Sequence, residues 1–246
     1  MNSINDRRRV IVQFVNWAAA FWFALPLFPR IAVGKENRVS REGVMKLPPP
    51  SAEGTVSVEQ AINQRRTVRK FASRPVNVNQ VSQLLWSAQG ITENDGFKRA
   101  APSAGALYPT NIYVVAGHNS VAHMEAGVYQ YEPKGHVLSL VVKSDLREVV
   151  ARAALSQMWI ARAPLSMVIT AEFKRITVKY KKRGVIYAVI EAGHIGQNLF
   201  LQAEALGLKA GIVGAFYEKK LIEAIRIPPS HEPLLIMPIG YHLNLA

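Results

Sequence analysis

Arg65-Arg66-Thr67-Val68-Arg69-Lys70-Phe71 and Ala101-Pro102-Ser103-Ala104-Gly105-Ala106-Leu107-Tyr108-Pro109 are the two stretches of this sequence that determine its interpretation. The first places three arginines and a hydroxyl within five residues. Guanidinium groups can neutralise a phosphate dianion, and Thr67 can complete its shell of hydrogen bonds. The second is a turn of small residues between two prolines, where backbone can approach a flat ligand closely. Together they predict a site for a nucleotide-type cofactor.

Each stretch has a simpler interpretation when it is taken alone. A basic helix end that faces solvent would explain the arginines, because cations stabilise the C-terminal end of a helix dipole. Arg65 and Arg69 are four residues apart, however, and could converge with Arg66 on one anion. Pro-Ser and Tyr-Pro are ordinary turn residues. The prediction therefore depends on the order and spacing of the two stretches.

Composition limits the classes of function. Hydrophobic residues make up 49% of the 246 residues, which is enough for a sizeable core. The formal net charge of +13 suits nucleic acid, an anionic membrane surface or acidic small molecules. Residues 173–183 contain no acid, but no recognised nucleic-acid motif accompanies them, so nucleic acid is not expected as a partner. There is no cysteine, and the histidines show no metal-ligand spacing, so no metal site is expected.

The N-terminal part is expected to lie outside the folded domain. Residues 1–34 begin with a basic stretch and continue with apolar residues 10–28, which would span roughly 28 Å as a helix. They are interpreted as a signal sequence or an N-terminal membrane anchor, with a buried helix as the alternative. Asp6-Arg7-Arg8-Arg9-Val10-Ile11 resembles a twin-arginine export signal. We therefore expect a protein that is exported (periplasmic or extracytoplasmic) or anchored in a membrane through residues 10–28, rather than a cytoplasmic one.

The rest of the chain is divided into a linker and one domain. Residues 35–55 are polar and end near Leu47-Pro48-Pro49-Pro50, which favours a stiff linker. Residues 56–246 are expected to form the domain. Helices are predicted at 57–65, 78–89, 146–161, 185–206 and 218–226, and strands at 111–116, 128–131, 137–142, 165–171, 210–213 and 234–239. Without regular βαβ units, this order favours an α+β fold.

The longest predicted helix, 185–206, is apolar around most of its circumference, which predicts that it is buried on two sides. Val189, Gly193, Gly196 and Ala203 would let a second helix approach closely. A homodimer built on this helix is the preferred interpretation.

The chain resembles the FMN-dependent nitroreductase superfamily, and within it the SagB-type branch, the azoline-oxidising dehydrogenases of thiazole/oxazole peptide biosynthesis. The resemblance runs from about Leu47 to Tyr241. Eight matching pieces occur in register, at residues 47–50, 65–71, 84–92, 101–109, 127–133, 191–199, 213–216 and 238–241.

The resemblance implies a nitroreductase-like fold, in which helices flank a central, mostly antiparallel sheet, and a homodimer with FMN in the groove between its subunits. It implies that the phosphate and ribityl chain are held by Arg65, Arg66, Thr67 and Arg69. The residues that would contact the flavin from the partner subunit are Pro102, Ser103, Ala104 and Ala106. Those that would lie along the isoalloxazine ring are Val213, Gly214 and Ala215.

Lys179-Tyr180 matches the Lys-Tyr pair that SagB-type oxidases use near the flavin. Oxidation of an azoline removes a proton from carbon while a hydride passes to flavin N5, and a lysine or a tyrosine could accept that proton. These two residues are therefore the candidate catalytic residues. An exposed basic turn is the alternative interpretation, because Lys181, Lys182 and Arg183 follow.

The expected function is that of an FMN-dependent oxidoreductase that transfers two electrons as a hydride through flavin N5. NAD(P)H is a candidate transient electron donor, and a small molecule or a peptide-derived compound is the expected substrate. The alternative is a membrane-tethered flavin-binding module of the same fold without turnover.

Overall fold

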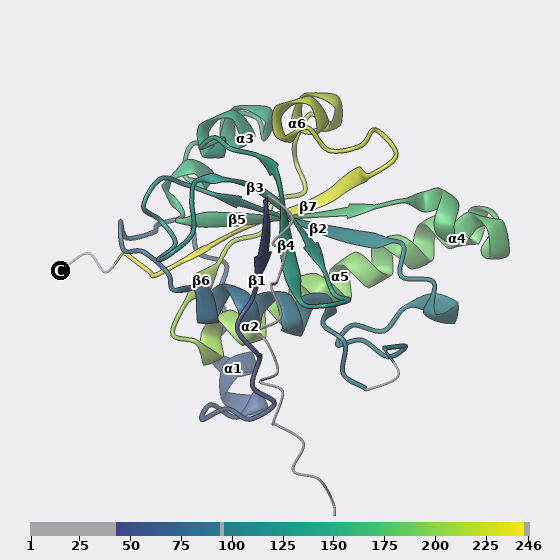
Figure 1. Ribbon diagram of the computed structural model, residues 1–246, viewed down its shortest axis with the longest axis horizontal. Helices are drawn as coiled ribbons and strands as arrows, with labels where there is room; N and C mark the ends of the chain where they lie inside the picture. The colour runs from purple at the N-terminus through teal and green to yellow at the C-terminus, as the bar shows by residue number, and fades with distance from the viewer. Residues whose placement is uncertain (1–42, 94–95, 244–246) are drawn as a thin grey trace, which may run out of the picture. The chain divides into compact units, whose positions relative to one another are not determined.

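Seven strands form one sheet in the order β1-β4-β3-β2-β5-β7-β6, and each neighbouring pair is antiparallel (Figure 1). The computed structural model describes residues 43–93 and 96–243. Its strands are β1 (Val44–Lys46), β2 (Thr110–Ala116), β3 (Gly127–Glu132), β4 (Val137–Val142), β5 (Leu165–Ala171), β6 (Lys209–Ala210) and β7 (Glu232–Gly240). Its α-helices are α1 (Val58–Gln64), α2 (Val78–Gln89), α3 (Arg147–Ala153), α4 (Phe173–Tyr180), α5 (Lys182–Ala205) and α6 (Glu218–Ile225). The predicted α+β class and the antiparallel sheet flanked by helices are confirmed.

Strand β2 shows why helices cover both faces of this sheet. Successive side chains of a strand point to opposite faces. Ile112 and Val114 are buried in the hydrophobic cluster that includes residues of α2 and α5. Tyr113 and Val115 are buried in the cluster that includes residues of α3 and α6. Both faces of the strand are therefore apolar, which explains why its sequence does not alternate between polar and apolar residues.

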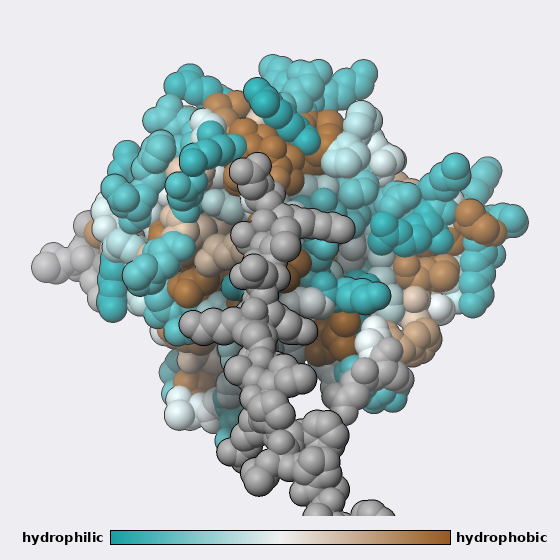
Figure 2. All heavy atoms as spheres, in the orientation of Figure 1, coloured by the Kyte–Doolittle hydropathy of each residue, from teal (hydrophilic) through white to brown (hydrophobic). Residues whose placement is uncertain are grey.

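Hydrophilic side chains cover much of α3, α4 and α6 on the face drawn in Figure 2, around smaller hydrophobic areas. The basic segment 173–183 comprises α4 and the start of α5. Its Lys174, Arg175 and Lys179 are exposed, so part of the positive charge of the chain lies in solvent along this helix.

Two helices begin at the caps that the sequence predicts. The Asn77 side chain accepts a hydrogen bond from the Gln80 backbone N–H at 2.8 Å, and the Gln80 side chain accepts one from the Asn77 N–H at 3.0 Å. This reciprocal pair is a capping box. At the start of α1, Ser57 Oγ accepts from the Gln60 N–H at 3.1 Å. The helices predicted at 57–65 and from residue 78 are thus confirmed.

The helix predicted at 146–161 is wrong in its second half. Helix α3 ends at Ala153, and Leu155 and Ser156 then adopt φ angles of 55° and 59°, which interrupt a right-handed helix. A short 3₁₀ helix, Ile160–Arg162, follows. The break places Trp159 against Phe71, with the two ring centroids 6.4 Å apart. A long-range contact therefore determines where this helix ends.

Part of the predicted linker 35–55 belongs to the sheet. Strand β1 pairs with β4, and Leu47 is buried in the main hydrophobic cluster. The Leu47 N–H donates to the His136 carbonyl at 3.1 Å, and Ser82 Oγ donates to the Pro48 carbonyl at 2.6 Å. The proline stretch therefore lies along the edge of the sheet and over α2 and is not a free tether.

Residues 1–34, which the sequence assigns to a signal sequence or an anchor, lie outside the described residues, and their role stays a prediction. Within residues 43–93 and 96–243, no helix is both long enough and apolar enough to cross a membrane.

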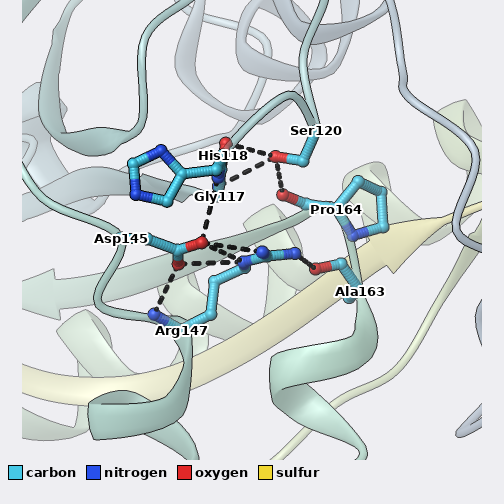
Figure 3. Close-up of polar contacts among 7 residues, drawn as sticks. All are labelled: Gly117, His118, Ser120, Asp145, Arg147, Ala163 and Pro164. Atoms are coloured by element: carbon cyan, nitrogen blue, oxygen red, sulfur yellow. Dashed lines mark hydrogen bonds and ion pairs between the residues drawn. The ribbon is translucent and has the colours of Figure 1, made fainter.

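An ion pair between Asp145 and Arg147 connects, through hydrogen bonds, the residues that follow β2 with those that precede β5 (Figure 3). Arg147 Nη2 lies 2.7 Å from Asp145 Oδ2, and Arg147 Nη1 donates to the Ala163 carbonyl at 3.2 Å. Asp145 also accepts a hydrogen bond from the His118 N–H at 2.9 Å. A Cβ atom on Gly117 would lie only 1.9 Å from Cζ of Arg147, so a side chain at this position would displace the guanidinium. We refer to these five residues as the clamp.

The clamp is expected to make stability depend on pH. Burial alone would raise the pKa of Asp145, but hydrogen bonds from Arg147 and from the His118 N–H lower it from 3.8 to about 2. Asp145→Asn is therefore expected to reduce the free energy of unfolding by about 2 kcal/mol at pH 7. Because the folded-state pKa is depressed, this stabilisation is present above the unfolded pKa of 3.8 and is lost as the pH falls through about 2.

Urea denaturation of the two proteins at a series of pH values measures this difference. Glu148→Gln is the matched control, because Glu148 forms only an exposed ion pair with Arg152 at 3.5 Å, which contributes about 0.5 kcal/mol or less. Equal stabilities of Asp145→Asn and the unchanged chain at pH 7 would contradict the role of the clamp.

Candidate functional site

The segment that contains the three arginines lies beside β6. The Val68 N–H donates to the Ala210 carbonyl at 2.9 Å, and Thr67 forms a parallel bridge with the same residue. A Cβ atom on Gly211 would lie 2.8 Å from the Val68 carbonyl oxygen and 2.7 Å from the Trp159 ring. Glycine at position 211 is therefore required for this close approach.

The three guanidinium groups of this segment are held in place without being neutralised. Arg65 lies over the Phe200 ring, 5.1 Å from its centroid, and Arg69 lies 5.7 Å from the Trp159 ring centroid. Arg66 Nη1 donates to the carbonyls of Asn63 and Arg65, both at 2.8 Å. Among the described residues none of the three arginines forms an ion pair. Their positive charge is therefore available to an anion.

The predicted ring-contacting segment follows β6 in the chain. Val213 and Ile236 exchange both backbone hydrogen bonds at 2.9 Å, which fixes the start of the segment. Gly214 and Ala215 are exposed, and a Cβ atom on Gly214 would meet nothing within 4 Å. The backbone of this segment is fixed at Val213 and faces open space at Gly214.

We call residues 65–71 together with residues 208–215 the arginine half of the site.

The small-residue loop before β2 has an unusual backbone. Ala104–Ala106 form a 3₁₀ turn, and the Tyr108 N–H donates to Ser103 Oγ at 2.9 Å. The φ angles are 62° at Gly105, 52° at Ala106 and 46° at Tyr108. The left-handed region is costly for residues with a side chain, and such strain is common at binding sites. The backbone of this loop is therefore consistent with the predicted role in ligand binding.

Lys179 and Tyr180 lie against this loop. A Cβ atom on Gly105 would be 2.7 Å from Tyr180 Oη and 3.0 Å from Lys179 Nζ. The Tyr180 ring packs edge-on against Tyr187 of α5, at 5.2 Å between centroids. The two residues end α4, so the alternative of an exposed basic turn is wrong in its conformation, although Lys179 is exposed. We call residues 102–108 with Lys179 and Tyr180 the Lys-Tyr half of the site.

A buried acid supports the Lys-Tyr half, and the sequence interpretation did not single it out as a site residue. Glu191 of α5 is 1% exposed and accepts hydrogen bonds from Thr110 Oγ1 at 2.6 Å and from Gln89 Nε2 at 3.0 Å. Burial raises the pKa of Glu191, while the Ser103 hydroxyl and the bonds from Thr110 and Gln89 oppose the shift. The sequence feature that could have revealed it is an acid in the apolar first half of the predicted helix 185–206.

A single chain does not bring the two halves together. The arginine half contacts α5 at Phe200, and the Lys-Tyr half contacts it at Tyr187. These residues are 13 positions apart on one helix, which corresponds to about 20 Å. Of five cavities among the described residues, one is lined in part by Phe71, and no other residue of either half lines any of the five. Each chain therefore presents two open half-sites at separate positions along α5.

The family model for nitroreductases matches residues 62–241, more than half of the chain. The chain belongs to the nitroreductase family. This result agrees with the sheet and helices described above, and at the level of the family it indicates an oxidoreductase.

Individual relatives of this nitroreductase-family chain agree with the assignment. It is 40% identical over 185 residues to a nitroreductase-type protein of Methanocaldococcus jannaschii, and the match covers 75% of this chain and 91% of the relative. The crystal structure of a nitroreductase-type protein from Ralstonia eutropha JMP134 has a TM-score of 0.71 at 28% identity, covering 82% of this chain and 91% of the other. The microcin B17-processing protein McbC of Escherichia coli is 22% identical over 169 residues, covering 67% of this chain and 62% of McbC.

Helix α5 of this nitroreductase-family chain has an uncovered apolar face. Val185, Ile186, Val189 and Ile190 are between 39% and 50% exposed, and Gly193 has open space before it. The prediction that Gly196 and Ala203 would also meet a second helix is wrong. Ala203 is fully buried, and a Cβ atom on Gly196 would touch Leu235 and Met237 of the chain's own sheet at 3.5 Å.

Proposed function

We propose that this nitroreductase-family chain is an FMN-dependent oxidoreductase that works as a homodimer. Each cofactor site would combine the arginine half of one chain with the Lys-Tyr half of its partner. The observation on which the proposal rests is that three arginines without an ion pair among the described residues lie in the segment bridged to Ala210 of β6, four residues before Gly214, which faces open space.

The residues of the arginine half fit the chemistry of FMN. Arg65, Arg66 and Arg69 can donate charge-assisted hydrogen bonds to a phosphate, with the Thr67 hydroxyl as a further donor. Gly214 leaves room for a flat ring to lie close to the backbone. The arginine half thus offers hydrogen-bond donors for the phosphate of FMN and room for its ring.

The Lys-Tyr half can handle a proton. When bound, FMN supplies a hydride acceptor at N5 of its ring. Lys179 Nζ and Tyr180 Oη lie beside Gly105, in the loop proposed to contact the flavin, so either group can take a proton from a substrate held there. We therefore propose a SagB-type dehydrogenase acting on an azoline of a peptide-derived substrate, with NAD(P)H as a transient donor for other acceptors. The likeness to McbC, whose name describes microcin processing, supports this choice.

Reconstitution of the full chain with FMN tests the proposal. The purified protein is expected to retain a yellow chromophore after gel filtration, with one phosphate for each chain. A protein that stays colourless after incubation with FMN would contradict the function. The protein could instead retain FMN and oxidise neither NAD(P)H nor azoline peptides. That result would favour the alternative of a flavin-binding module without turnover.

The proposed dimer rests on the apolar face of α5. Exposed valine and isoleucine side chains in consecutive turns of one helix are costly in water and are typical of the centre of a homodimer interface. A two-fold axis across α5 would set the Tyr187 end of one helix near the Phe200 end of the other. This arrangement would place the Lys-Tyr half of each chain next to the arginine half of its partner.

Charges on this face are expected to separate the subunits. The variant Val189→Glu with Ile190→Glu should be a monomer in analytical ultracentrifugation, because two carboxylates would be buried without partners. It should also lose FMN, since each site would lack its second half. Val149→Glu on α3 is the matched control, because Val149 is 41% exposed on the other side of the sheet. A double variant that remains a dimer and keeps FMN would refute this interface.

A further inference from the structure

A cavity of about 460 Å³ lies at the end of the sheet where β2 ends and β5 begins. It is lined by Phe71, Ala72, Ser73, Arg74, Pro75, His118, Asn119, Ser120, Arg147, Ala161, Arg162, Pro164 and Leu243. Phe71 also belongs to the arginine half, but none of the lining residues is among those proposed to contact FMN. The volume is within the range of pockets that hold small organic ligands, roughly 300–1,000 Å³.

The polar wall of this cavity is basic. Arg74, Arg147, Arg162 and His118 line it, Asp145 hydrogen-bonds to it, and Glu148, which pairs with Arg152, lines the adjoining cavity. Asp145 is already used by Arg147 and by the His118 N–H. Among the described residues neither Arg74 nor Arg162 forms an ion pair. Two full positive charges therefore remain available at one cavity.

The groups of this wall are held by the structure around them. The Arg74 guanidinium lies over the Tyr241 ring, 3.9 Å from its centroid, which restricts its rotamers. Ser120 Oγ accepts a hydrogen bond from the Gly117 N–H at 2.8 Å and lies 2.5 Å from the Pro164 carbonyl oxygen (Figure 3). The turn of His118 and Ser120 is therefore fastened to the strand opposite, next to the clamp. A ligand would find this wall largely preformed.

The remaining wall is apolar, since Phe71, Ala161, Pro164 and Leu243 contribute carbon atoms to the cavity. A ligand that matches both walls has a compact anionic group and an apolar body. Two free guanidiniums can each present a fork of N–H groups to a tetrahedral dianion, which a phosphate satisfies better than a single carboxylate.

We propose that this cavity binds a small organic phosphate monoester. Its phosphate lies between Arg74 and Arg162, and its carbon body lies on the apolar wall. The concave shape and the volume favour a small molecule over an extended polymer. The site borders the arginine half at Phe71 but uses none of the arginines proposed to hold FMN.

Calorimetric titration of the full chain, saturated beforehand with FMN, tests this proposal with phenyl phosphate, inorganic phosphate and phenol as probes. Phenyl phosphate is expected to bind more tightly than inorganic phosphate, because its ring covers the apolar wall, and phenol is expected not to bind. Failure of phenyl phosphate to bind at millimolar concentration would overturn the proposal. Phenol binding as tightly as phenyl phosphate would overturn the basic wall as the recognition element.

Two charge-removing variants locate the binding. Arg74→Ala and Arg162→Ala are each expected to weaken phenyl phosphate binding by about tenfold, the loss of a charge-assisted hydrogen bond. Lys134→Ala removes the same charge from an exposed turn and is expected to leave the affinity unchanged. Circular dichroism confirms that each variant is folded. If Arg74→Ala and Arg162→Ala bind normally while Arg65→Ala with Arg69→Ala does not, the phosphate occupies the proposed flavin site and this proposal is wrong.

Discussion

Lys179→Ala and Tyr180→Phe are each expected to lower the turnover of a thiazoline-containing peptide by about a hundredfold or more, while FMN stays bound. The reason is geometric. Lys179 Nζ and Tyr180 Oη both lie beside Gly105, so removal of either takes away a group that can accept a proton next to the flavin. Turnover is measured at saturating FMN, and retained flavin is measured from the visible spectrum of the same preparation.

Lys181→Ala is the matched control for this experiment. Lys181 is exposed, and its Nζ donates to the Val178 carbonyl at 3.2 Å, so its loss removes the same charge without changing the Lys-Tyr half. Reduction of a quinone by NAD(P)H serves as a second readout, which is expected to change only a few-fold. If Lys179→Ala and Lys181→Ala lower peptide turnover equally, Lys179 has no catalytic role. An unchanged chain that does not act on the peptide at all would contradict the SagB-type assignment but not FMN binding.

The double variant Arg65→Ala with Arg69→Ala is expected to weaken FMN binding by at least about a hundredfold. Each arginine would contribute a charge-assisted hydrogen bond to the phosphate, and such a bond is typically worth about 1.5–3 kcal/mol. Quenching of flavin fluorescence during titration with the apoprotein measures the dissociation constant. Riboflavin, which lacks the phosphate, is expected to bind equally to both proteins.

Lys70→Ala provides the control for this second prediction, because Lys70 is an exposed cation that directly follows Arg69. Its affinity for FMN is expected to stay within a few-fold of the unchanged chain. Lys179→Ala should also retain more FMN than Arg69→Ala. Equal retention in these two variants would show that the arginine half does not hold the phosphate.

Much of the sheet could be predicted because local patterns coincide with its elements. Residues 165–171 follow Pro164 and contain the β-branched run 168–170, and β5 occupies the same range. The hairpin at Pro133-Lys134-Gly135 joins β3 and β4 as the turn chemistry requires, with Gly135 at a φ of 89°. Capping residues located the starts of α1 and α2. In these places the local residue pattern alone determines the conformation.

Other elements depend on partners that are distant in sequence. Nothing local ends α3 at Ala153, since glycine and proline are absent until Pro164. The helix ends there because Trp159 packs between Phe71 and Gly211. Strand β1 is only three residues long, and its hydrogen bonds come from β4. Because its own sequence is a short polar stretch before three prolines, it is easily mistaken for a linker. Tertiary contacts override the local preference in both cases.

The residues of the candidate site could be named from the sequence, but their grouping could not. The loop that contains Gly105 and the pair Lys179-Tyr180 are more than seventy residues apart, and their contact follows from the antiparallel pairing of β2 with β5. The support that Glu191 gives to this loop also crosses from α5 to β2. The separation of roughly 20 Å along α5 follows only once the contacts of Arg65 with Phe200 and of Tyr180 with Tyr187 are known.

The length of α5 has a genetic consequence. If the halves of each site come from different chains, a chain without its arginines and a chain without Lys179 are both inactive alone. A hybrid of the two would contain one intact centre and one doubly defective centre. Co-expression of two dead alleles would then restore activity, as in intragenic complementation.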